Sequence, residues 1–125
     1  MARKRTQCGN NFLFYIKKIA MEQPNLSYIQ SMSGGDKTFE NKLISIIKSE
    51  FPKEKATYKT NIDSSNFKKA AENVHKLKHK ISILGLEKSY EVAVEFENNL
   101  LENSTTGKKA FEAILQKMTD FLETI

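Results

Sequence analysis

The chain has 125 residues, of which 39% are hydrophobic and 28% are charged, as expected for one globular domain with a single core. Its formal net charge of +5 comes from residues 1–20, which hold five basic residues and no acidic one, whereas the fifteen basic and fifteen acidic residues that follow cancel. The composition therefore argues against nucleic-acid binding by the folded part. The apolar run at residues 12–16 is far shorter than the ~20 residues of a membrane span, so we expect no membrane protein either.

The N-terminal segment and the cysteine content limit the possible domain organisations. Cys8 is the single cysteine, which excludes a disulfide within the chain and favours a reducing, cytoplasmic location. Residues 1–20 have three possible interpretations: a disordered tail, a short docked helix, or translated sequence upstream of the true start. The composition changes at Met21, so we expect a dispensable basic tail at 1–20 and one helical domain at 21–125.

The first half of this domain is expected to contain two helices. Residues 24–32 have room for a short helix, with Pro24 near its first position and Ser33-Gly34-Gly35 at its end. Asp36 is a good N-cap for the next helix. Its apolar positions keep helical phase across Pro52, which predicts one long helix kinked near Phe51. These apolar positions are Phe39, Leu43, Ile46, Ile47, Phe51, Tyr58 and Ile62.

Three more helices are predicted in the second half. After a turn at residues 61–66, apolar residues recur every three or four positions over about 65–84, where Gly85 interrupts the pattern. A further helix runs to about Glu102, a loop follows at 103–107, and the last helix carries apolar residues from Phe111 to Ile125. No useful stretch alternates with period two. The predicted fold is all-α: an antiparallel four-helix bundle, with the short N-terminal helix covering one end and a flexible basic tail.

Both histidines of the chain lie one turn apart on the helix at 65–84. At 100° per residue His75 lies off the apolar seam and shares its face with polar residues only, namely Lys68, Glu72, Lys78, His79 and Ser82. We therefore expect an exposed imidazole surrounded by lysines. Imidazole side chains in water titrate near pH ~6.5, so a neutral, nucleophilic nitrogen is common at cytoplasmic pH.

The residues that follow His75 have a recognisable spacing. An apolar residue lies two positions later, a lysine three, and a glycine ten, with a serine between them: Leu77, Lys78, Gly85 and Ser82. This pattern resembles the histidine-containing phosphotransfer (HPt) domain of bacterial phosphorelays. Glu50-Phe51-Pro52 and Phe96-Glu97 also look like that family, and the resemblance covers about residues 36–102. The chain departs from it at His79, where the family has a glycine.

The resemblance implies a function for this face of the helix. His75 would accept a phosphoryl group from a receiver-domain aspartate and pass it to another receiver, and Lys78 would stabilise the phosphoryl oxygens. The receiver would dock on a face formed by Lys76, His79, Ser82 and Gly85. Lys76 and Lys80 are expected to add a general basic surface that attracts the acidic pocket of a receiver.

The resemblance also implies the partners and cofactors. Response-regulator receiver domains, and a hybrid histidine kinase, are the expected partners of a monomeric chain. No Gly-rich phosphate loop is present, so we expect a phosphotransfer carrier rather than a kinase. The chain would need no cofactor of its own, and Mg²⁺ would belong to the receiver.

Other interpretations stay open at this point. His75 can be an ordinary exposed histidine, and Lys78 a solvated lysine. The bulk of His79 allows a module that occupies receivers without phosphotransfer, and the basic tail allows an RNA or membrane contact. His75 and His79 have the i, i+4 spacing of helical zinc ligands, but Lys76 replaces the glutamate of the metalloprotease motif and lysines repel a cation, so no metal site is expected.

Overall fold

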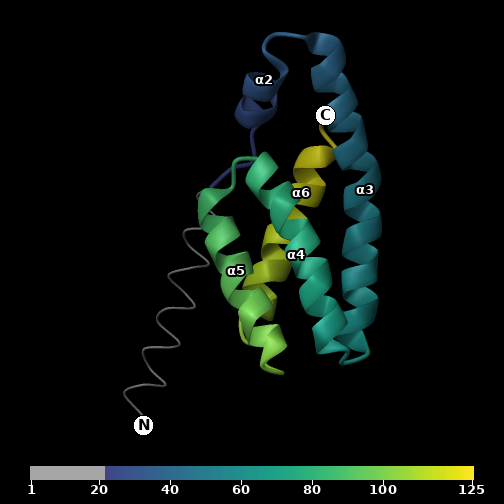
Figure 1. Cartoon of the computed structure of the whole chain (residues 1–125), viewed down its shortest axis with the longest axis vertical. Helices are drawn as coiled ribbons and strands as arrows, with labels where there is room; N and C mark the ends of the chain where they lie inside the picture. The colour runs from purple at the N-terminus through teal and green to yellow at the C-terminus, as the bar shows by residue number, and fades with distance from the viewer. Residues whose placement is uncertain (1–21) are drawn as a thin grey trace.

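The computed structural model describes residues 22–125, which form five α-helices and no strand (Figure 1). The helices are α2 (Ser27–Ser33), α3 (Lys37–Asp63), α4 (Phe67–Ile83), α5 (Glu87–Leu101) and α6 (Lys108–Leu122). The predicted all-α helical bundle is confirmed. The predictions for residues 1–20, including Cys8, lie outside the described part of the chain. No helix of residues 22–125 combines the length and apolar character that crossing a bilayer requires.

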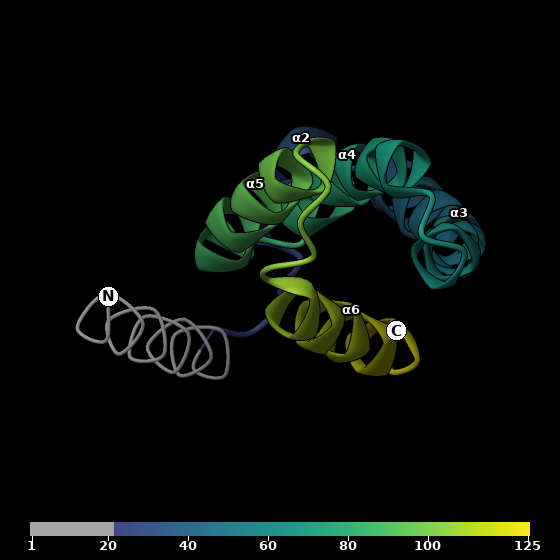
Figure 2. The same ribbon diagram turned by 90° about the horizontal axis from the view of Figure 1, so that it is seen from below.

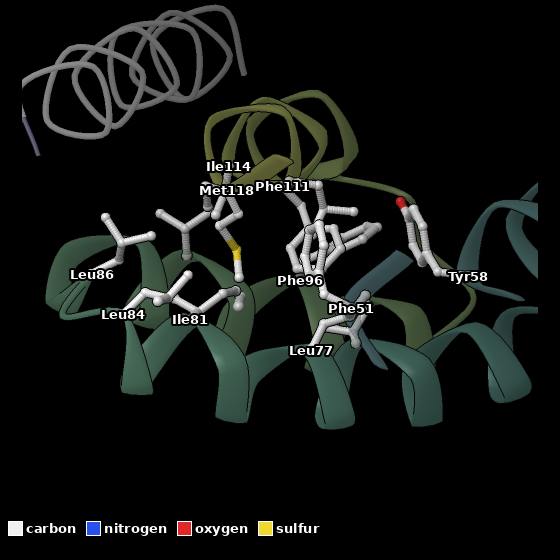
Figure 3. Packing of buried hydrophobic residues seen from close by; sticks show 14 of the residues in the cluster. Phe51, Tyr58, Leu77, Ile81, Leu84, Leu86, Phe96, Phe111, Ile114 and Met118 are labelled. Atoms are coloured by element: carbon white, nitrogen blue, oxygen red, sulfur yellow. The ribbon is translucent and has the colours of Figure 1, made fainter. Parts of the chain in front are cut away.

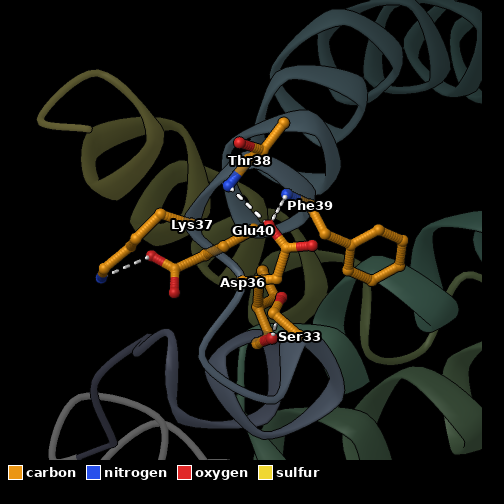
Figure 4. Close-up of polar contacts among 7 residues, drawn as sticks. Ser33, Asp36, Lys37, Thr38, Phe39 and Glu40 are labelled. Atoms are coloured by element: carbon orange, nitrogen blue, oxygen red, sulfur yellow. Dashed lines mark hydrogen bonds and ion pairs between the residues drawn. The ribbon is translucent and has the colours of Figure 1, made fainter.

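Helix α3 begins where the sequence predicts. The carboxylate of Asp36 accepts hydrogen bonds from the backbone N–H groups of Thr38 and Phe39, at 3.0 and 3.2 Å, and so acts as the N-cap (Figure 4). One continuous helix runs through Pro52, so the prediction of one long helix rather than two is confirmed, and its ribbon bends along its length (Figure 1). Pro24 does not begin α2, which starts three residues later.

The first turns of α3 depart from the predicted apolar seam. Phe39 and Ile46 are 44% and 42% exposed, whereas Ile47, Phe51 and Tyr58 are buried. Ile46 and Ile47 are neighbours in the chain and so differ by about 100° around the helix, and only Ile47 lies on the buried face. Length adds to the exposure of Phe39: at 1.5 Å per residue, α3 is about 40 Å long and α4 about 25 Å. The N-terminal part of α3 therefore extends beyond α4 and has only the short α2 beside it (Figure 1).

The reversal between α4 and α5 is a Schellman motif at Gly85. The backbone N–H of Gly85 bonds to the Ser82 carbonyl at 3.0 Å, and that of Leu86 bonds to the Ile81 carbonyl at 3.2 Å. Gly85 has φ +78°, a left-handed conformation that disfavours other residues. Ile81 and Leu86 belong to the same buried cluster (Figure 3), which supplies the apolar contact that accompanies this motif.

The core joins α6 to the other three long helices. Phe111, Ile114 and Met118 of α6 face Ile81 and Phe96 in Figure 3. Helix α4 packs extensively against both α3 and α5, whereas α3 and α6 contact each other little. Seen from below, α3, α4 and α5 form an arc and α6 lies across its open side (Figure 2). Helix α6 also lies less close to α5 than α4 does, so the tightest backbone packing is among α3, α4 and α5.

The segment before α2 is bound to both α5 and α6. The Glu22 carboxylate accepts hydrogen bonds from the backbone N–H groups of Lys88 and Ser89, at 2.7 and 2.9 Å, and from the Ser89 hydroxyl. These are unpaired donors in the first turn of α5, so Glu22 caps that helix from a distant part of the chain. Its backbone carbonyl accepts a hydrogen bond from the Lys117 ammonium of α6.

Tyr58 is expected to make stability fall at high pH. Its phenol is buried and donates a hydrogen bond to Glu112 at 3.1 Å, and burial, followed by the nearby Glu112 charge, raises the pKa of Tyr58 far above its usual value. The folded chain therefore keeps a proton that the unfolded chain releases above about pH 10, so the free energy of unfolding falls as pH rises past that point.

Denaturant unfolding of the wild type and of Tyr58→Phe tests this. At about pH 8 the substitution is expected to cost roughly 1–2 kcal/mol, because Glu112 loses its donor. Between about pH 8 and pH 11 the wild type should lose more stability than the variant. Tyr28→Phe is the control, because Tyr28 is 52% exposed. Equal pH dependence of all three proteins would contradict the prediction.

Candidate functional site

His75 stands on the outer face of α4 and is paired with a residue of α5. Its side chain is 55% exposed, and its Nδ1 lies 3.1 Å from Oε2 of Glu97. The expected exposure of the imidazole follows from the helix pattern, since Val74 and Leu77 on either side of it are fully buried. One ring nitrogen is thus held by a carboxylate while much of the ring is open to solvent.

Glu97 bridges His75 to Lys78. Its second carboxylate oxygen, Oε1, lies 2.8 Å from the Lys78 ammonium, and the side chains of Lys78 and Glu97 are only 12% and 17% exposed. The ammonium also lies 5.6 Å from the centre of the Tyr90 ring, within the range of a cation–π contact. Lys78 is therefore not a freely solvated lysine. Both of its neighbours, Glu97 and Tyr90, lie on α5, so its ammonium lies between α4 and α5.

The carboxylate determines which nitrogen of a neutral His75 is nucleophilic. A carboxylate only accepts hydrogen bonds, so its contact with Nδ1 favours the tautomer with the proton on Nδ1. The lone pair is then on Nε2, on the far side of the ring from Glu97. If Nε2 bonds to an electrophile the ring becomes cationic, and Glu97 is placed to stabilise that charge. The arrangement suits nucleophilic attack by Nε2 on an approaching group.

His79 covers one side of His75. The two ring centres are 5.2 Å apart and the rings are nearly perpendicular, at 88°. This edge-to-face contact means that His79, at the position where the HPt pattern has glycine, restricts the directions from which a partner can approach His75. Within residues 22–125, no three His, Cys, Asp or Glu side chains gather into a group that could hold a metal ion.

The other predicted docking residues lie at increasing distances along the helix. Lys76 and Ser82 are exposed and Gly85 is half-buried. At 1.5 Å per residue, Ser82 and Gly85 lie about 10 and 15 Å along the axis from His75. A side chain at Gly85 would approach Asn25 Nδ2 to 2.7 Å. The structure thus gives Gly85 a clear role in the chain reversal, and its place in a docking face stays a prediction.

Lys80 does not belong to the basic surface expected for it. Its side chain is only 12% exposed, and its ammonium lies 2.9 Å from Glu50 and 3.3 Å from Glu54, both on α3. The prediction of a general basic surface from Lys76 and Lys80 is therefore wrong for Lys80. The two carboxylates of α3 neutralise the charge of Lys80, and the residue pattern of α4 alone does not reveal them. Of the two, only Lys76 is exposed.

Neither Glu97 nor Tyr90 has a role in the prediction from the sequence. A usable signal exists, because helices that reverse at Gly85 place residues at similar distances from the turn side by side. His75 lies ten positions before Gly85 and Glu97 twelve positions after it. The predicted α4–α5 hairpin therefore already brought the two side chains to the same level.

No family model, curated protein or solved structure matches this chain. What is known of the site therefore comes from its own residues: an exposed imidazole, a carboxylate bound to its Nδ1, and a lysine paired with the same carboxylate.

Proposed function

We propose that the chain is a phosphorelay intermediate that carries a phosphoryl group on His75. The observation that supports this most is the contact of Nδ1 with Glu97, which leaves Nε2 of an exposed ring as the nucleophile. The helical order and the spacing from His75 to Gly85, which resemble the HPt domain, support it further. A cytoplasmic location, and receiver domains of response regulators or of a hybrid kinase as partners, are parts of the same proposal.

The reaction balances with the groups at hand. Nε2 attacks the phosphorus of a receiver's aspartyl phosphate in line, the N–P bond forms, and the P–O bond to the aspartate breaks with its electron pair leaving on the carboxylate. The ring keeps its Nδ1 proton and becomes cationic beside Glu97. The reverse steps deliver the group to a second receiver. A receiver would bring Mg²⁺ and the aspartate, so the proposal assigns no cofactor to this chain.

Lys78 has a conditional role in this proposal. In the resting chain its ammonium is paired with Glu97, so it also offsets the charge of the carboxylate. A phosphoryl group on Nε2 would add negative charge within one helical turn of Lys78. To contact the phosphoryl oxygens, the Lys78 side chain has to turn from Glu97 toward the Nε2 side of the ring, and its three donors allow one bond to the carboxylate to be kept. Its role is to stabilise the transferred group rather than to bind receivers.

Transfer from phosphorylated receivers tests the proposal. Receivers of the same organism, labelled on aspartate, are incubated with the full chain, and the label on the chain is tested for loss in acid and persistence in alkali. We expect label with the stability of phosphohistidine from at least one receiver. Complete absence of transfer from the organism's whole receiver set would contradict the proposal.

The second candidate is a module that occupies receivers without chemistry. The observation that favours it is the His79 ring packed against His75, which narrows the approach to Nε2. This module would bind a receiver without becoming labelled, and the binding would persist in His75→Ala. Binding and labelling measured on the same receiver therefore separate the two functions.

Glu97→Gln is expected to slow phosphoryl transfer about 10- to 100-fold, the cost that is usual when a metal-bound histidine loses the carboxylate on its other ring nitrogen. Glutamine keeps the shape but loses the charge that stabilises the cationic ring and pairs with Lys78. Rates of label acquisition from one receiver measure the effect. Glu95→Gln is the matched control, since Glu95 is exposed on the same helix. Equal rates in both variants would remove Glu97 from the mechanism.

A further inference from the structure

Tyr90 contacts the phosphotransfer site through Lys78. The centre of its ring lies 5.6 Å from the Lys78 ammonium. Tyr90 and Glu97 are seven positions apart on α5, about two helical turns, so both face α4. The Lys78 side chain beside them is only 12% exposed. An ammonium that is largely removed from water has a stronger cation–π contact than an exposed one, so the ring contributes to the resting position of Lys78.

The Tyr90 ring has a fixed position, whereas Lys78 can move. Tyr90 is half-buried and packs against the main core. Its backbone N–H bonds to the Leu86 carbonyl at 2.9 Å, in the first turn of α5. Lysine carries its ammonium on a flexible four-carbon stem. Any change in the contact between the two residues therefore comes from a movement of the Lys78 side chain.

The hairpin places Tyr90 and His75 on opposite sides of Lys78. The distances from Gly85 along the chain are five positions for Tyr90, seven for Lys78 and ten for His75. At 1.5 Å per residue, the Tyr90 backbone lies about 3 Å nearer to the reversal than that of Lys78, and the His75 backbone about 4.5 Å farther from it. A movement of the ammonium toward a phosphoryl group on His75 is therefore a movement away from the Tyr90 ring.

This movement gives up the contact with Tyr90 before the contact with Glu97. One of the three ammonium donors can stay on the carboxylate while another reaches the phosphoryl oxygens. A cation–π contact requires the cation to lie within ~6 Å of the ring centre. The resting distance of 5.6 Å is close to this limit, so a displacement of about 1 Å already leaves the range.

We propose that Tyr90 is a positioning residue that holds Lys78 away from the phosphoryl group and so keeps that group transferable. This role rests on the proposed function, because it concerns the same transfer. On donation, the N–P bond breaks with its electron pair staying on Nε2, and a P–O bond forms to the aspartate of the next receiver. A phosphoryl group that Lys78 binds strongly leaves Nε2 less readily. Tyr90 limits that binding and acts through Lys78, not on the reacting atoms.

The equilibrium of transfer with one receiver tests this role. Rates of transfer to and from the full chain are measured with one labelled receiver, and their ratio gives the equilibrium constant. Tyr90→Leu removes the ring but keeps an apolar side chain, and it should shift the equilibrium toward phosphohistidine about 3- to 10-fold. Tyr90→Phe is the matched control, because it keeps the ring face and should match the wild type. Partial unfolding cannot favour phosphohistidine, so the direction of the shift separates positioning from a structural defect.

Two further measurements show whether the effect passes through Lys78. In a Lys78→Met background, Tyr90→Leu should leave the equilibrium unchanged, because the ring has no ammonium to hold. In the unphosphorylated chain, Tyr90→Leu should speed acetylation of Lys78 by acetic anhydride at least about threefold, as measured by peptide mass spectrometry.

Three results would overturn the role of Tyr90 and leave the proposed function intact. The first is transfer by the wild type with an equilibrium that Tyr90→Leu leaves unchanged or shifts toward the receiver. The second is the same shift with and without Lys78, and the third is equal acetylation of Lys78 in the wild type and in Tyr90→Leu. A wild type that takes label from no receiver would instead contradict the proposed function itself.

Discussion

Exchange of His75 for glutamine is expected to abolish phosphoryl acceptance while the bundle stays folded. Glutamine has no basic nitrogen, so no N–P bond forms. The side chain is 55% exposed and its neighbours on the core side are intact, so the free energy of unfolding should change by no more than about 0.5 kcal/mol. Label transfer from a phosphorylated receiver measures acceptance, and circular dichroism with denaturant measures the fold.

His79→Gln is the matched control for this experiment. Both histidines are exposed on α4, but within residues 22–125 it is the His75 ring whose nitrogen is paired with Glu97. We expect His79→Gln to retain labelling. If the His79 ring restricts docking, the variant should also accept the phosphoryl group from more receivers. Label that persists in His75→Gln and disappears in His79→Gln would move the acceptor to His79 and refute the assignment.

The sequence contains most of the fold because each helix shows its own buried face. The α4 seam is buried from Ala70 to Leu84, and the Asp36 cap and the Gly85 reversal follow from local chemistry that tertiary contacts do not override. The exposure of His75 follows in the same way. These features depend on residues within a few turns of one another, so periodicity is sufficient to predict them.

Contacts between helices could not be derived with the same success. Lys80 looks like a surface lysine in α4, yet Glu50 and Glu54 of α3 neutralise it. The bond from the Glu22 carboxylate to Ser89 joins residues 67 positions apart. The small contact between α3 and α6 depends on where the two helices separate, and no residue pattern on either one encodes that separation. Pairing across helices is set by axial register and crossing angle, which a single sequence leaves open.

Phe96→Ala is expected to cost about 3–5 kcal/mol of the free energy of unfolding, the usual range for removing a large aromatic side chain from a packed core. Phe96 is fully buried, and its ring centre lies 5.1 Å from that of Phe111 and 6.3 Å from that of Tyr58 (Figure 3). The substitution empties the place where α3, α5 and α6 meet. Since whole domains are stable by about 5–15 kcal/mol, this is a large fraction of the total.

Denaturant unfolding of Phe96→Ala beside Leu101→Ala measures this effect. Leu101 is on the same helix and 58% exposed, so its truncation should change the free energy of unfolding by no more than about 0.5 kcal/mol. A loss under about 1 kcal/mol for Phe96→Ala would contradict the packing of Phe96 in the core.

Phe96 immediately precedes Glu97, so its burial fixes the face of α5 that meets His75. The folded fraction of Phe96→Ala should therefore accept phosphoryl groups more slowly than the wild type, whereas Leu101→Ala should match it.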